Sequence, residues 1–243
     1  MTADRYRQLE AEPLIKTATR LGERIRARFP DRNLASVADA LEATLANVAG
    51  HAEPPRWRGG LRQVSRATAV LIAVSIPLVI VSAIVHAWHN ADLAGFEWIA
   101  VAESAINDLV FSALAIIFLW AAPVRLLRSR ALKQAHELRT MAHVIDMHQL
   151  AKDPDRFRVD YEPTSASNDP ALTPSQLSTY LDYCSEMLSL VAKGAALLAS
   201  HHDDPAVLSA VRDVEQLCIG LSSKIWQKIG LLPQIEETFR IID

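Results

Sequence analysis

The sequence predicts an all-α protein with a two-helix transmembrane hairpin, a cytoplasmic helical bundle and a coiled-coil-like antiparallel helix pair. Two long apolar runs, Ala67–Trp88 and Trp98–Trp120, are separated only by residues 89–97. Outside these runs, apolar residues recur at spacings of three and four, which is the period of an amphipathic helix. No segment of any length alternates in the way that a strand does.

Each apolar run is long enough to cross a bilayer. At about 1.5 Å per residue each run spans roughly 33 Å, and a hydrocarbon core is about 30 Å thick. Trp98 and Trp120 end the second run, where tryptophan is typical of the headgroup region. Because the link is so short, we expect an antiparallel hairpin over residues 67–122, with spans at 67–88 and 98–120.

Basic residues lie on one side of this hairpin. A linker over residues 51–66 carries arginines at 56, 58, 62 and 66, and the second span is followed by Arg125, Arg128, Arg130 and Lys133. The link holds Asp92 and Glu97 but no Lys or Arg. Short basic loops stay in the cytoplasm, so we expect both termini there. The Ala- and Arg-rich composition favours a bacterial inner membrane, and the first run begins too far along the chain for a signal peptide.

Residues 1–50 are expected to form a cytoplasmic N-terminal helical pair, broken at Pro30-Asp31. The apolar positions of its first helix are Leu14, Ala18, Leu21, Ile25 and Phe29, and those of its second are Leu34, Val37, Leu41, Leu45 and Val48.

A stalk helix is expected over residues 123–151, as a continuation of the second span. Pro123 precedes it, and a proline can kink a helix without ending it. Its apolar stripe consists of Leu127, Leu138, Met141, Ala142 and Ile145. Residues 152–172 show no period, and they predict a loop that is either flexible or a strap over the helices.

Residues 173–243 are expected to form the antiparallel helix pair. Thr173 begins a capping box with Pro at the first helical position, and Asp204-Pro205 begins the second helix in the same way. We expect Pro233 to end the second helix and a short final helix to follow over Gln234–Ile242. The two apolar seams are Leu177, Leu181, Cys184, Leu188, Val191, Ala195 and Leu198, and Val207, Val211, Val214, Cys218, Leu221 and Ile225.

No motif in the sequence indicates catalysis, so we expect no enzyme, no catalytic residues and no cofactor. The stalk contains a cluster of titratable residues, His136, His143, Asp146 and His148. One straight helix cannot surround a metal ion. We therefore favour packing against neighbouring helices over a metal, catalytic or pH-sensing role. We interpret His201-His202-Asp203-Asp204 as a helix cap. The two cysteines are not spaced as a metal site or a redox pair requires, so we expect no metal site. The basic residues near the spans are already explained by membrane topology, so we expect no surface that binds nucleic acid.

The second run is polar on part of its face. With Glu103 at zero and about 100° per residue, Asn107 falls at about 40° and Asp108 at about 140°. The polar set on this face is Glu103, Ser104, Asn107, Asp108 and Ser112. Asp108 is near the middle of the span, where a carboxylate facing lipid costs about 2.5–3.5 kcal/mol. One serine-containing helix cannot enclose it, so we expect a homo-oligomer in the bilayer.

Further along the same face the polar residues give way to Leu114 and Phe118. In an oligomer these two positions predict an apolar constriction beneath a wet vestibule. The competing interpretation is that Asp108 only forms hydrogen bonds between helices.

The stretch Gln63–Leu150, a short hairpin whose second helix runs on into cytoplasmic helices, resembles the SLATT-type two-helix membrane effectors of bacterial defence systems. The resemblance implies a protein that perforates membranes when a nucleotide-sensing partner triggers it. Our first hypothesis is an oligomeric pore or channel gated by its cytoplasmic helices, because a pure anchor has no use for Glu103, Asn107 and Asp108. The alternative is a membrane-anchored scaffold whose helical bundle recruits a protein partner.

Overall fold

In the computed structural model, regular structure in the described part of the chain is helical throughout, which confirms the predicted all-α class. The structure describes residues 9–52, 63, 66–74, 77–78, 81, 85, 97–158, 160–165 and 172–242. It separates into two compact units. We call Met1–Glu53 with Ala131–Asp243 the bundle unit, and Pro54–Arg130 the apolar unit.

In the bundle unit, α1 (Ala11–Arg28) and α2 (Leu34–Ala52) form the predicted N-terminal pair. Phe29 caps the end of α1, and its backbone N–H donates to the carbonyl of Ile25. Every apolar position that the three- and four-residue spacing predicted for this pair is buried, which confirms both stripes.

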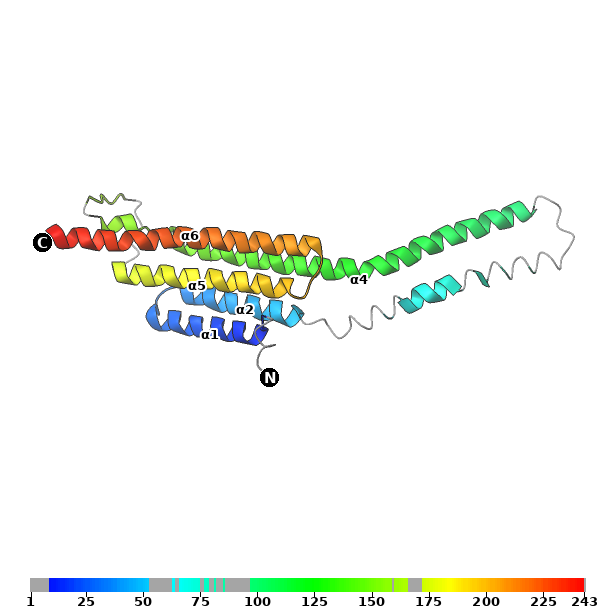
Figure 1. Ribbon diagram of the computed structural model, residues 1–243, viewed down its shortest axis with the longest axis horizontal. Helices are drawn as coiled ribbons and strands as arrows, with labels where there is room; N and C mark the ends of the chain where they lie inside the picture. Colours follow the sequence, from blue (N-terminus) through cyan, green and yellow to red (C-terminus); the bar gives the residue numbers. More distant parts are fainter. Residues whose placement is uncertain are drawn as a thin grey trace. The chain divides into compact units, whose positions relative to one another are not determined.

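The helices α5 (Pro174–Ala199) and α6 (Pro205–Ile242) pack against each other, and α5 also contacts α1 and α2 (Figure 1). All the seam positions predicted for the two helices are buried. The Thr173 capping box is present, since its hydroxyl accepts from the Gln176 N–H at 3.2 Å and the Gln176 side chain accepts from the Thr173 N–H at 2.9 Å.

The prediction that Pro233 ends the second helix is wrong. The helix α6 runs through this position to Ile242. A proline removes one backbone donor and crowds the preceding turn, but the remaining hydrogen bonds can carry a helix past it.

A third layer of the core comes from α4, whose residues 131–150 belong to the bundle unit. Leu138, Ala142 and Ile145 are buried on the predicted stripe. Gly194 of α5 lies where α2 and α4 meet, because a Cβ built there would be 2.5 Å from a methyl group of Leu45 and 3.2 Å from one of Leu138. Only the absence of a side chain allows this close approach.

The connection from α4 to α5 holds a short 3-10 helix, η1 (Pro154–Phe157), that the sequence analysis missed. Asp153 caps it, accepting from the Asp155 N–H at 3.1 Å, and Pro154 is buried. Because η1 contacts both α5 and α6, this part of the connection is a strap rather than a free loop.

In the apolar unit, α4 (Glu97–Leu150) continues through Pro123 without ending, as predicted. Residues 66–74 of the first apolar run are helical. The other part of that run, ten of its 22 residues, lies outside the described residues, as do most of the predicted linker 51–66 and of the link 89–97.

Candidate functional site

The predicted polar residues all lie on α4 within the apolar unit. Glu103, Ser104, Asn107 and Asp108 are exposed, and Ser112 is half-buried. Positions 104, 108 and 112 follow one another at intervals of one turn, so these three residues share a face of the helix. The structure therefore places the polar set along one helix, and four of its five side chains are exposed.

The two residues of the predicted constriction lie further along α4, one turn apart. Leu114 is 56% exposed and Phe118 is 67% exposed. Because both side chains are so exposed, they do not form a constriction within a single chain.

The surroundings of this polar face are apolar and open. Ile106, Leu109, Val110 and Ile117 of α4 are all exposed by half or more, as are Leu71 and Leu78 of the first run. Within the described residues, α4 is the one helix whose length and composition would allow it to cross a membrane, and its apolar window has a mean hydropathy of 2.1 with none of it buried.

The histidines of the stalk do not pack as the sequence analysis favoured. His136 and His143 are exposed, because their positions turn away from the buried stripe of Leu138 and Ile145. Asp146 accepts from Gln149 of its own helix at 2.5 Å. His148 is half-buried, and burial lowers the pKa of its imidazole, with the Lys152 charge as a smaller cause.

The cap interpretation of the second histidine cluster is confirmed for Asp204. Its carboxylate accepts from the Ala206 N–H at 2.9 Å, and its carbonyl accepts from the Leu208 N–H at 3.0 Å. Among the described residues, no three His, Cys, Asp or Glu side chains are grouped so that they could hold a metal ion.

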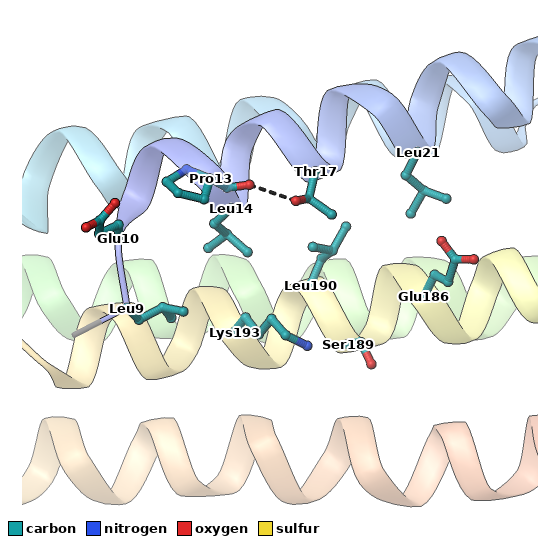
Figure 2. Close-up of a pocket in the computed structure, with 10 residues that line it drawn as sticks. All are labelled: Leu9, Glu10, Pro13, Leu14, Thr17, Leu21, Glu186, Ser189, Leu190 and Lys193. Carbon is teal, nitrogen blue, oxygen red and sulfur yellow. Dashed lines mark hydrogen bonds between the residues drawn. The ribbon is translucent and has the colours of Figure 1, made fainter. Parts of the chain in front are cut away.

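A groove between α1 and α5 is a feature that sequence reasoning missed. Its volume is about 670 Å³, and Figure 2 shows apolar side chains of both helices facing each other across it, among them Leu14 and Leu190. Polar and charged groups stand at its edges, including Glu10, Thr17 and Lys193. No local pattern could have predicted a groove between helices so far apart in the sequence.

One end of this groove is fixed by an ion pair. The Arg24 guanidinium donates to both carboxylate oxygens of Glu186, at 2.9 and 3.1 Å, and lies 5.2 Å from the centre of the Tyr183 ring. The hydrogen bond to Glu186 raises the pKa of Arg24. Both partners are partly exposed, so this contact fixes geometry more than it adds stability.

These features define an all-α protein with a packed helical bundle and a second unit whose apolar helix surface is open. No protein-family model, curated protein or solved structure matches the chain.

Proposed function

We propose that this chain is a two-pass protein of the bacterial inner membrane, and that copies of it assemble around a conducting path lined by α4. The observation that carries the proposal is the open apolar surface of α4 with a polar face on the same helix. An exposed apolar patch of this kind needs lipid or another protein to cover it.

The charge pattern supports the orientation. Arg125, Arg128, Arg130 and Lys133 follow the second run, and arginines also precede the first. Short basic segments are retained in the cytoplasm, so both termini and the bundle unit would be cytoplasmic.

The polar face supports assembly into a pore. Asp108 is exposed near the middle of the apolar stretch of α4, where contact with lipid costs about 2.5–3.5 kcal/mol. An oligomer that turns the face of Glu103, Ser104, Asn107 and Asp108 toward a central axis gives these groups water and leaves Leu109 and Ile117 to the lipid. A ring of carboxylates at that depth favours cations.

Leu114 and Phe118 supply the gate in this proposal. Both lie beyond the polar set on the same face, and a ring of such side chains can stop ion flow by excluding water. The organisation resembles SLATT-type effectors, which perforate membranes when a nucleotide-sensing partner triggers them. A cytoplasmic protein or a nucleotide would act on the bundle unit.

A second candidate function is a membrane-anchored scaffold. The observation that favours it is the groove between α1 and α5, whose apolar walls and polar edges suit a partner segment. In that case the apolar unit is an anchor, and Asp108 forms hydrogen bonds between helices worth about 0.6–2 kcal/mol.

Ion flux through liposomes distinguishes the two functions. We expect Phe118→Ser to wet the constriction and raise cation flux above that of the wild type, with the oligomer intact. The matched control is Ile116→Ser, which has the same depth but lies about 160° away around the helix axis. Asp108→Asn should reduce the preference for cations. If Phe118→Ser and the control give equal flux while both remain assembled, the channel proposal fails and the scaffold is favoured.

A further inference from the structure

The helix α6 carries a second stripe of residues beside the seam that packs on α5. The members of this stripe follow one another at intervals of three and four, which places them on one face of the helix. They are Ala210, Asp213, Leu217, Gly220, Lys224 and Gln227. Four of the six are exposed, while Ala210 and Leu217 are half-buried and pack in part against the core. We call this stripe the outer seam.

The middle of the outer seam is hollow. A depression of about 390 Å³ lies there, and its lining includes Asp213 and Lys224 at the two ends and Leu217 and Gly220 between them. Gly220 leaves room in it, since a Cβ built there has nothing within 4 Å. A hollow beside a leucine is the arrangement through which packed helices receive side chains of each other.

The charges at the two ends of the hollow are opposite in sign. Within the described residues, neither Asp213 nor Lys224 forms an ion pair, and both side chains are exposed. An occupant that suits the hollow therefore carries a cation at the Asp213 end and an anion at the Lys224 end. A second α6 that runs in the opposite direction carries this pattern.

We propose that the outer seam is an interface at which α6 packs antiparallel on α6 of a second copy of this chain. In an interface with twofold symmetry, residue i contacts residue j and j contacts i. A twofold axis midway between Leu217 and Gly220 places each leucine opposite the glycine of the other copy. The same axis places Asp213 opposite Lys224, because these two residues have the same midpoint in the sequence.

A parallel pair does not suit this stripe. It would set Asp213 against Asp213 and Lys224 against Lys224, and like charges that face each other across an interface oppose association. It would also bring two leucines together at one level and two glycines at another, so that the hollow stays empty. The charges and the packing therefore favour the same direction.

This contact is separate from both proposed functions. The pore depends on α4, and the scaffold depends on the groove between α1 and α5. The twofold axis of the pair crosses α6 at right angles. For two copies in one bilayer that axis is the membrane normal, so α6 of each copy would lie along the membrane surface.

Disulfide trapping in the full-length protein tests the interface. Ala210→Cys and Gln227→Cys change two positions that the twofold axis brings together, and the native Cys184 and Cys218 are buried. We expect a cross-linked dimer when both variants are produced in the same cells and the membranes are treated with a mild oxidant. Either variant alone should not cross-link, because two copies of one position are then roughly 25 Å apart along the helix and a disulfide requires Cα atoms within about 7 Å.

The charge pattern is tested in the same co-produced pair. Asp213→Lys in both chains should lower the rate of cross-linking by about tenfold or more, since repulsion replaces attraction at both ends of the interface. Adding Lys224→Asp should restore the rate, because the ion pairs form again with their charges exchanged. The matched control is Arg212→Asp, an equally large change of charge at an exposed position about 100° away around the helix, and it should leave the rate unchanged.

A cross-link at these positions reports on α6 alone, whatever holds the apolar units together. Ala210→Cys is nearly isosteric and the other substitutions are at exposed positions, so every variant should unfold at the temperature of the wild type. Equal cross-linking by either cysteine variant alone would show a parallel contact and overturn the proposal. The proposal also fails if the co-produced pair does not cross-link, or if Asp213→Lys leaves its rate unchanged.

Discussion

The bundle unit and the apolar unit are both rich in large aliphatic side chains, but the bundle unit buries them and the apolar unit exposes them. Leu138 and Leu188 of the bundle unit are fully buried, whereas Leu71 and Phe111 of the apolar unit are 71% and 69% exposed. The helices of the bundle unit are apolar along one stripe, so each stripe finds a partner within the chain. In the apolar unit the second run is apolar around most of its circumference, and within the described residues its large side chains stay exposed.

The difference has an energetic meaning. Burying a leucine or phenylalanine side chain contributes about 1.5–3 kcal/mol, and the bundle unit gains this from its own core. Within a single chain, the described part of the apolar unit obtains little of this free energy of burial, because its large side chains stay exposed. Its stability must then come from lipid or from further copies, which is why the proposed function places it in a membrane.

The largest expected difference comes from replacing one leucine by aspartate in each unit and comparing the stability of the bundle unit in the two variants. Leu188→Asp puts a charge into the fully buried seam, and we expect it to remove about 4 kcal/mol or more, enough to abolish cooperative unfolding of the bundle unit. Leu109→Asp, at a position 53% exposed on the apolar face of α4, should leave that transition within about 0.5 kcal/mol of the wild type. It should instead lower the fraction of protein recovered in membranes.

Circular dichroism against temperature measures the first effect, and membrane fractionation measures the second. Equal loss of bundle stability in the two variants would show that both regions unfold as one unit, and would break the contrast.

Two glycines test packing density at a finer scale. Gly194→Ala would force Leu45 and Leu138 to move in a filled core, and we expect a loss of about 1–3 kcal/mol. Gly220→Ala, on the exposed face of α6 with nothing within 4 Å of the new methyl group, should instead stabilise by about 0.5–1 kcal/mol. Urea unfolding gives both values, and a neutral result at Gly194 would mean that the core around it is loosely packed.

The smallest expected effect is a pH dependence from His148. Because burial lowers its pKa in the folded state, the unfolded chain takes up the proton first as the pH falls through the ordinary value of 6.5. Stability should therefore decrease between that pH and the lower folded-state pKa. His148→Gln should remove this decrease, by less than about 1 kcal/mol since the group is half-exposed. His136→Gln, at an exposed position of α4, is the control. Identical pH profiles for the wild type and His148→Gln would contradict the assignment.

The parts of the fold that sequence reasoning predicted are those determined by neighbours in the sequence. Helical spacing identified the buried stripes around Leu21 and Leu188, and the cap residues Thr173 and Asp204 were found because each acts on backbone within a few positions. The same local signal, Asp153 before Pro154, would have predicted η1. Pro233 was misjudged because the remaining backbone hydrogen bonds can carry a helix past the one that a proline removes.

The candidate sites were predicted less well, for a physical reason. The polar residues of α4 were found because they interrupt one apolar run. The groove depends on which distant segments meet, as Leu14 and Leu190 do, and no spacing rule reports that. His136 and His143 were expected to pack because one straight helix cannot surround a metal ion, but the helix turns them outward.

The bundle unit is built from two stretches that lie on either side of the apolar unit in the sequence, and this order has a consequence for biosynthesis. On the ribosome α1 and α2 are complete long before α5, the helix that covers them, begins at Pro174. At about 5–20 residues per second the interval is of the order of 10 s. Throughout that time Leu45 lacks its partner at Gly194 of α5, while the most apolar part of the nascent chain emerges. A ribosome that stalls within this interval therefore leaves an aggregation-prone fragment, and timely completion of α5 protects the newly made protein from chaperone capture and proteolysis.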